Sequence, residues 1–173
     1  EWQNKEKIVY SKEIKGVSLN KGMNELKIPI SAPEAKLWSV DDPNLYVCEV
    51  ELSEGKNWVD KDSRRFGFRW FEASGIGEDA VFRLNGKRIM LRSAISWSFW
   101  PVNGIFPSEE LAERQIRIAK ELGLNMLNFH RFIGNTDVMN YADELGLLYF
   151  EEPGGFRLDV RQPFMNAVLH EKV

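Results

Sequence analysis

Three short apolar runs in the second half of the sequence each end in polar residues that could do chemistry. The residues at these three ends are, in chain order, Arg92 and Ser93, then Asn128, His130 and Arg131, then Glu151 and Glu152. If the runs are parallel strands of one sheet, their ends meet at a single edge. A guanidinium, an imidazole, an amide and carboxylates would then lie together. This set of groups suits a polyhydroxylated ligand.

Each of these residues also has a purely structural interpretation. Arg92 could equally form an ion pair with Glu151 or Glu152, and His130 could be a hydrogen-bonded residue of the rim. Arg131 more often anchors a loop. Because Glu151 and Glu152 are adjacent, their side chains leave a strand in opposite directions. They are therefore a poor acid/base pair, whose carboxyl groups must face each other across a bond.

Aromatic residues gather in the segment Ile95–Pro101, which has neither a helical nor a strand period. Composition favours rings that fill a gap between two domains. The alternative is a platform for the apolar face of a flat ligand, such as a sugar ring, to which Trp97 would contribute.

A repeated phrase indicates how the polar ends are positioned. Glu121-Leu122-Gly123 and Glu144-Leu145-Gly146 lie 23 residues apart, and each precedes an apolar run. The spacing predicts helices over 109–122 and 136–145, started by Ser108 and by Asn135 or Thr136, with strands over 124–129 and 147–150. A third helix is predicted over 163–173. Alternating helices and strands predict a parallel sheet.

The first part of the chain has the pattern of antiparallel β structure. The predicted strands cover 8–10, 17–19, 25–30, 45–52, 57–60 and 64–71. Tyr46, Cys48, Val50 and Leu52 form the apolar face of one strand, so the core is expected on that side. Several short strands separated by turns predict a β-sandwich. After a glycine-rich boundary at 73–77, Asn85-Gly86 predicts a tight hairpin that leads into a first strand near 89–91.

Composition excludes several classes of function. The formal net charge is −3 and there is no basic run, so nothing points to nucleic acid or to a membrane partner. No apolar stretch approaches the roughly 20 residues that cross a bilayer. His130 and His170 are far apart and Cys48 is the single cysteine, so neither a metal nor a cofactor is expected. The chain begins at Glu1 without a leader, which indicates a processed or excised piece and leaves its compartment open.

Five segments together resemble glycoside hydrolase family 2, the β-galactosidase, β-mannosidase and β-glucuronidase group. In chain order they are Leu37–Tyr46, Arg65–Arg69, Leu84–Arg92, Leu122–Asn125 and Ala142–Leu148. The resemblance implies a multidomain β plus α/β fold. Residues 1–74 would form an immunoglobulin-like β-sandwich, incomplete at its start, and residues 75–173 the first part of a (β/α)8 TIM barrel.

The resemblance also implies a function, carried residue by residue. The parent protein would be a retaining exo-glycosidase acting on terminal β-linked sugars. Glu151-Glu152 match the family's third-strand acidic pair. Asn128 stands where the family usually has arginine, and the residues after it and after Arg92 depart from the family pattern. The sugar contacts would be Arg92, Trp97, Asn128, His130 and Glu151. The acid/base and nucleophile glutamates would lie beyond Val173, so this segment alone should be inactive.

Other functions stay open at this point. The chief alternative is a non-catalytic carbohydrate-binding or scaffolding module, and a phosphate-binding β/α enzyme is a third interpretation. An unfinished barrel would also leave open edge strands, through which copies of the chain would self-associate.

Overall fold

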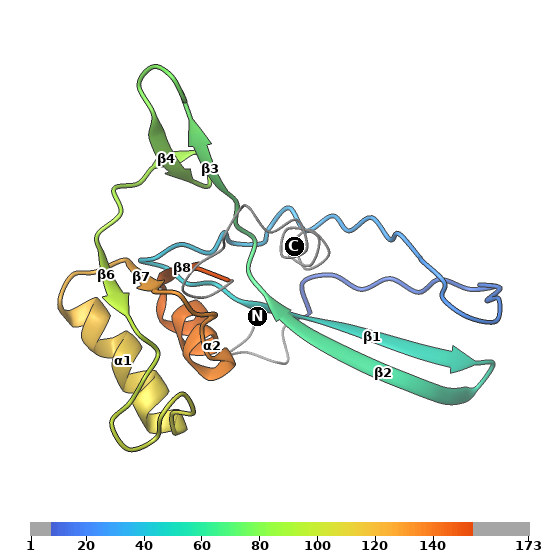
Figure 1. Cartoon of the computed structure of the whole chain (residues 1–173). Helices are drawn as coiled ribbons and strands as arrows, with labels where there is room; N and C mark the ends of the chain where they lie inside the picture. Colours follow the sequence, from blue (N-terminus) through green and yellow to red (C-terminus); the bar gives the residue numbers. More distant parts are fainter. Residues whose placement is uncertain (1–7, 154–173) are drawn as a thin grey trace, which may run out of the picture. The chain divides into compact units, whose positions relative to one another are not determined.

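The computed structural model describes residues 8–153, which belong to two compact units (Figure 1). The first unit comprises the chain up to Trp38 together with Asn44–Phe68, and the second comprises Ser39–Pro43 together with the chain from Arg69 onward. The predicted helix over 163–173 lies outside the described residues. In chain order the elements are β1 (Tyr46–Glu54), β2 (Asn57–Phe66), β3 (Phe71–Ser74), β4 (Val81–Leu84), β5 (Lys87–Arg88), β6 (Ser93–Ser96), α1 (Glu109–Glu121), β7 (Met126–Phe129), α2 (Thr136–Leu145) and β8 (Leu148–Glu151).

The first unit contains a single pair of strands among its described residues. β1 and β2 are antiparallel, with a register shift between Leu52 and Ser53. Near the start of β1, the ring of Tyr46 packs against those of Phe66 and Phe68 at centroid distances of 6.1 and 5.4 Å. Trp38 is fully buried. A Cβ on Gly67 would lie 2.9 Å from the Trp38 Cβ, so this close approach requires glycine.

The prediction of further strands in the first unit is wrong for the described residues. No strand is present over 8–36, although Leu26, Ile28 and Ile30 alternate with polar residues as expected, and all three are exposed. Alternation shows which side chains could share a buried face, but a strand also needs a hydrogen-bonded neighbour. The two strands predicted over 57–60 and 64–71 are instead β2, followed after a break by β3. The β-sandwich is therefore not formed by the described residues.

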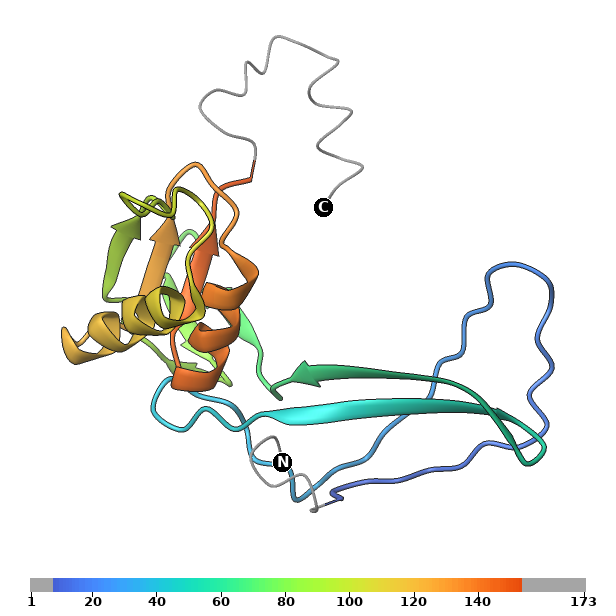
Figure 2. The ribbon, with the colours of Figure 1, turned by 90° about the horizontal axis from the view of Figure 1, so that it is seen from below.

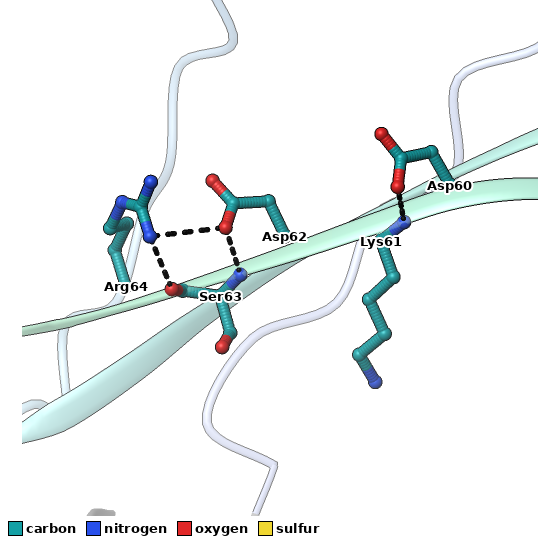
Figure 3. A network of polar contacts seen from close by, with 5 residues as sticks. All are labelled: Asp60, Lys61, Asp62, Ser63 and Arg64. Carbon is teal, nitrogen blue, oxygen red and sulfur yellow. Dashed lines mark hydrogen bonds and ion pairs between the residues drawn. The ribbon is translucent and has the colours of Figure 1, made fainter.

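The predicted apolar face of β1 is also wrong toward the tip of the ribbon. Val50 and Leu52 are 58% and 45% exposed. Their cross-strand partners are Asp62 and Asp60, and directly opposite residues of an antiparallel pair lie on the same face. Figure 3 shows both aspartates on one side of β2 and Lys61 on the other. At this end of the ribbon, the face therefore presents both apolar and charged side chains to solvent.

The predicted hairpin in the second unit is confirmed. β3, β4 and β5 form an antiparallel sheet, and β4 turns into β5 at Asn85 and Gly86. Both turn residues have positive φ, 53° and 75°. This is the backbone conformation that favours the Asn-Gly pair.

The predicted parallel sheet and its two helices are also confirmed. β6, β7 and β8 are parallel neighbours in chain order, with α1 and α2 lying together beside them (Figure 2). The caps are as predicted. The Ser108 side chain accepts from the Leu111 amide and the Asn135 side chain from the Asp137 amide, and Gly123 and Gly146 are left-handed at the helix ends. The buried core lies between helices and sheet and consists of Ala112, Ile116, Ala119, Leu127, Phe129, Val138, Ala142 and Leu147.

The predicted position of the first parallel strand is wrong by four residues. The Ile89 amide still bonds to the Phe82 carbonyl in the hairpin, at 2.9 Å. Asn125 then holds the next residues through its side chain, because its Nδ2 donates to the Met90 carbonyl and its Oδ1 accepts from the Arg92 amide. The parallel ladder begins only after Arg92, at β6. Arg92 therefore lies at the start of the strand and not at its end.

Candidate functional site

The register of the parallel sheet brings three side chains together at its carboxyl edge. Ser96, Phe129 and Glu151 are paired across β6, β7 and β8, and each is the last residue of its strand. The next residue of each strand is Trp97, His130 or Glu152. The ladder continues at this level, since the His130 amide donates to the Ser96 carbonyl at 3.0 Å.

The side chains of Trp97, His130 and Glu152 lie on the open face of the sheet, by which we mean the face away from α1 and α2. Leu127 and Phe129 of β7 are buried against the helices. Because side chains alternate along a strand, Asn128 and His130 point the other way. The register places Ile95 and Phe150 beside Asn128 on this face. We call Trp97, Asn128, His130 and Glu152 the carboxyl-edge site.

Glu152 connects the members of this site. Its Oε1 accepts from Asn128 Nδ2 at 3.1 Å, and its Oε2 accepts from the Arg131 amide at 2.9 Å. His130 Nδ1 lies 3.3 Å from the same Oε2. The Arg131 amide is the largest cause that holds the pKa of Glu152 below its ordinary value of 4.5. The Asn128 amide and His130 act in the same direction, and partial burial opposes them. Glu152 is thus a carboxylate that accepts hydrogen bonds at neutral pH.

Two left-handed residues shape the turns at this edge. Ser98 and Arg131 have φ values of 48° and 55°, and each lies two residues after the end of its strand. Residues other than glycine rarely adopt this conformation, and it is found most often where function or tight local geometry requires it. At Arg131 its effect is direct, because it aims the backbone N–H at Glu152.

Trp97 adds an aromatic surface to the site. Its ring lies 4.7 Å from that of His130, centroid to centroid, at an interplanar angle of 81°. This edge-to-face arrangement is favourable for aromatic pairs. Trp97 nevertheless remains 59% exposed, so its ring can contact a ligand.

Asn128 contributes a second polar group besides the amide that it donates. Its Oδ1 is buried and has no hydrogen-bond partner among the residues that the structure describes. An unpaired buried carbonyl oxygen is unfavourable until it accepts a hydrogen bond. The site therefore presents the Glu152 carboxylate, to which the Asn128 amide donates, next to an exposed indole. This arrangement can bind hydroxyl groups against an apolar ring face.

The structure brings together three of the five residues predicted to contact substrate, namely Trp97, Asn128 and His130. Glu151 is directed elsewhere, since its Oε1 accepts from the Gly134 amide at 2.8 Å. The predicted divergence of the two adjacent glutamates is thus confirmed, and Glu152 is the one that joins the site. Glu152 is not among the five residues that the sequence predicted to contact substrate. The parallel register alone indicates its position, because Glu152 follows the end of β8 by one residue, just as His130 follows the end of β7.

Arg92 does not belong to the carboxyl-edge site. Its Nε donates to the Gly123 carbonyl at 2.7 Å, at the end of α1. Gly123 precedes β7 just as Arg92 precedes β6, so both lie at the amino end of the sheet. The side chain ties this end together. Its predicted place beside His130 and the glutamates assumed that the first parallel strand ends at Arg92, whereas β6 begins after this residue.

Within residues 8–153, no group of three or more His, Cys, Asp or Glu side chains could hold a metal ion. None of the helices that the structure describes is both long and apolar enough to pass through a bilayer.

Comparisons with known proteins agree with this architecture. Residues 1–69 match the family described as "Glycosyl hydrolases family 2". Over 68% of its length, the chain is 34% identical to a putative β-glucuronidase of Formosa agariphila, and over 72% of its length it is 34% identical to a β-galactosidase of Thermoanaerobacterium thermosulfurigenes. It also resembles the structure of Bacteroides uniformis β-glucuronidase 2 covalently bound to cyclophellitol-6-carboxylate aziridine, with 26% identity over 82% of this chain and a TM-score of 0.66.

The matched regions are small parts of these proteins. The chain spans 14% and 17% of the two curated relatives and 16% of the solved chain. Over residues 1–69 this chain is therefore similar to glycosyl hydrolases family 2, and its relatives by sequence and by structure are named β-glucuronidases and β-galactosidases.

Proposed function

We propose that this chain is part of a retaining β-glycoside hydrolase, in which the carboxyl-edge site binds a terminal β-linked sugar. The observation that carries the proposal is the row formed by Trp97, His130 and Glu152 at the ends of three parallel strands. In enzymes built from repeated β/α units, substrates bind at this end of the sheet. The names of the relatives support the sugar as ligand.

The side chains have complementary roles in this proposal. The indole of Trp97 packs against the apolar face of the sugar ring. The Glu152 carboxylate accepts hydrogen bonds from sugar hydroxyl groups, while Asn128 holds this carboxylate in place and His130 lies between Trp97 and Glu152. Because Glu152 is ionised at neutral pH, it cannot serve as the general acid that protonates a leaving group.

The chemical step requires carboxyl groups outside this site. Retention of configuration needs two carboxyl groups about 5 Å apart across the scissile bond. Glu151 and Glu152 bond to different partners on opposite faces of the sheet and do not form such a pair. We therefore expect both catalytic carboxylates in other parts of the parent protein. Support for a retaining mechanism comes from the Bacteroides uniformis relative, which was solved covalently bound to its aziridine.

The proposal includes the domain organisation expected from the sequence. Residues 1–74 would belong to an immunoglobulin-like β-sandwich, and residues 75–173 to the first part of a TIM-barrel catalytic domain. Three parallel strands joined by α1 and α2 are compatible with the opening of such a barrel, which ordinarily needs about 250 residues.

The decisive experiment compares the parent protein with this segment. The parent protein should hydrolyse a 4-nitrophenyl β-galactoside or β-glucuronide, and a burst of nitrophenol would indicate a covalent intermediate. The 173-residue chain alone should give no turnover. Turnover by the isolated chain would contradict the assignment of the catalytic groups. Sugar binding by the parent without turnover would instead favour a non-catalytic carbohydrate-binding module.

A further inference from the structure

The turn that carries Trp97 is held from the helix side of the sheet by a polar residue of α1. Gln115 Nε2 donates a hydrogen bond of 2.6 Å to Ser96 Oγ, and the same oxygen accepts from the Ser98 amide at 3.2 Å. The Ser96 carbonyl accepts from the His130 amide. Ser96 thus joins α1, the turn after β6 and the end of β7.

This turn is buried and conformationally unusual on either side of Trp97. Ser96 and Ser98 are only 7% and 2% exposed, whereas Trp97 between them is 59% exposed. Ser98 has a φ of 48°. A left-handed serine persists only where its surroundings impose this conformation. The bond from Gln115 helps to impose it, because it fixes the hydroxyl oxygen that receives the Ser98 amide.

Burying the Gln115 amide here is unfavourable for stability alone. Its Oε1 and the Ser98 Oγ are both buried, and neither has a hydrogen-bond partner within residues 8–153. Leaving such groups unpaired is unfavourable, so an apolar side chain of similar size would serve simple packing better. The amide therefore points to a geometric role. It specifies how the turn is oriented.

We propose that Gln115 is a positioning residue that sets the orientation of Trp97 against His130 from behind the sheet. It lies on α1, on the helix side of the sheet, whereas the carboxyl-edge site lies on the open face. The consequence for sugar binding rests on the proposed function. The positioning itself does not, and it can be tested without any substrate.

The test uses the chain's two histidines, His130 and His170. The Cε1–H resonance of His130 is assigned by its loss in His130→Gln, and the contribution of the indole ring current is measured in Trp97→Ala. Gln115→Met removes the amide donor but keeps an unbranched side chain. Trp97→Ala shifts the His130 resonance by a measured amount from its position in the unsubstituted chain. Gln115→Met should shift this resonance in the same direction by at least half of that amount. Arg114→Ala, at an exposed residue one position away, should leave the resonance in place.

A second variant keeps the proposal testable if Gln115→Met does not fold. Ser96→Ala removes the acceptor of the Gln115 bond and should move the resonance in the same direction as Gln115→Met. If Gln115→Met folds and its His130 resonance stays at the position found in the unsubstituted chain, the proposal is wrong. If Gln115→Met does not fold, an unmoved resonance in Ser96→Ala would do so. A shift in resonance without glycosidase activity in the parent protein would uphold the positioning role and count only against the proposed function.

Discussion

Asn128 on β7 donates its side-chain amide to Glu152, one residue past the end of β8, across a distance of 3.1 Å. The bond crosses between adjacent parallel strands on the open face of the sheet. Together with the Arg131 amide, it surrounds the carboxylate with donors. The charge of Glu152 is therefore stabilised by folding, and this makes the site sensitive to acid.

The first prediction concerns this acid sensitivity. Because the folded state holds the pKa of Glu152 below 4.5, its charge stabilises the fold above that pH. The contribution is lost as the pH falls through the lowered value. Glu152→Gln should therefore reduce the melting temperature at pH 7, and its difference from the parent should shrink toward pH 3. Thermal melts recorded by circular dichroism from pH 7 to pH 3 measure this.

Glu54→Gln is the matched control, because Glu54 is exposed at the tip of the β1–β2 ribbon. Its melting temperature should follow that of the parent across the range. A Glu152→Gln protein that remains equally destabilised at pH 3 and pH 7 would show that the charge of Glu152 does not matter to the fold.

The second prediction compares the two glycines that end the helices. Gly123 and Gly146 have similar φ values, 77° and 80°. A Cβ on Gly123 would meet no atom within 4 Å, whereas one on Gly146 would collide with the Val40 carbonyl. Gly123→Ala should therefore cost only the left-handed strain, about 1–2 kcal/mol. Gly146→Ala should cost more, since the backbone around Val40 must also move. Urea denaturation measures both.

Lys120 provides a further check on the Gly146 result. Its Nζ donates to the Val40 carbonyl and, at 2.9 Å, to the Gly146 carbonyl. Because displacement of Val40 would already break this contact, Lys120→Met should cost less in Gly146→Ala than in the parent. If Gly123→Ala and Gly146→Ala lower the free energy of unfolding equally, the Val40 carbonyl does not approach Gly146 closely.

Local signals explain why the helices and the hairpin could be predicted. Ser108, Asn135 and Gly146 cap their helices through contacts with residues nearby in the chain, and the Asn-Gly turn defines its own hairpin. The identity of Glu152 as a site residue was also within reach, because the strand register relates it to His130.

The strand predictions that are wrong concern positions where contacts with residues distant in the sequence determine the structure. The start of β6 depends on the side chain of Asn125, more than 30 residues after Met90 in the chain. The strand expected over 25–30 has the right alternation, but no neighbour pairs with it among the described residues. Sequence periodicity cannot reveal either effect, since both depend on which segments meet in space.

The third prediction addresses ligand binding in the parent protein. Trp97→Ala should raise the KM for a 4-nitrophenyl β-glycoside about tenfold, as expected for the loss of one aromatic contact of about 1.4 kcal/mol. Trp97→Phe should retain part of the binding. Trp58→Ala is the control, since Trp58 is similarly exposed, at 67%, and lies on β2 in the other unit. If Trp97→Ala and Trp58→Ala have the same KM, Trp97 is not a sugar contact.

The fourth prediction is that the 173-residue chain associates with copies of itself. Among the described residues, β6 and β8 are the outer strands of the parallel sheet, and unpaired strand edges readily pair with another chain. On the open face, Ile95 and Phe150 are 60% and 55% exposed. Burial of both against a second copy would be favourable. Size-exclusion chromatography with light scattering should therefore show a mass above 20.1 kDa that falls on dilution.

A charge on the open face separates association through this sheet from nonspecific aggregation. Phe150→Lys should lower the associated fraction, because an unpaired ammonium group is costly to bury against an apolar surface. Val50→Lys is the matched control, since Val50 is 58% exposed but lies on β1 in the other unit. It should leave the mass distribution unchanged. A parent chain that elutes as a monomer at every concentration would contradict the prediction, and an equal effect of both lysines would place the contact elsewhere.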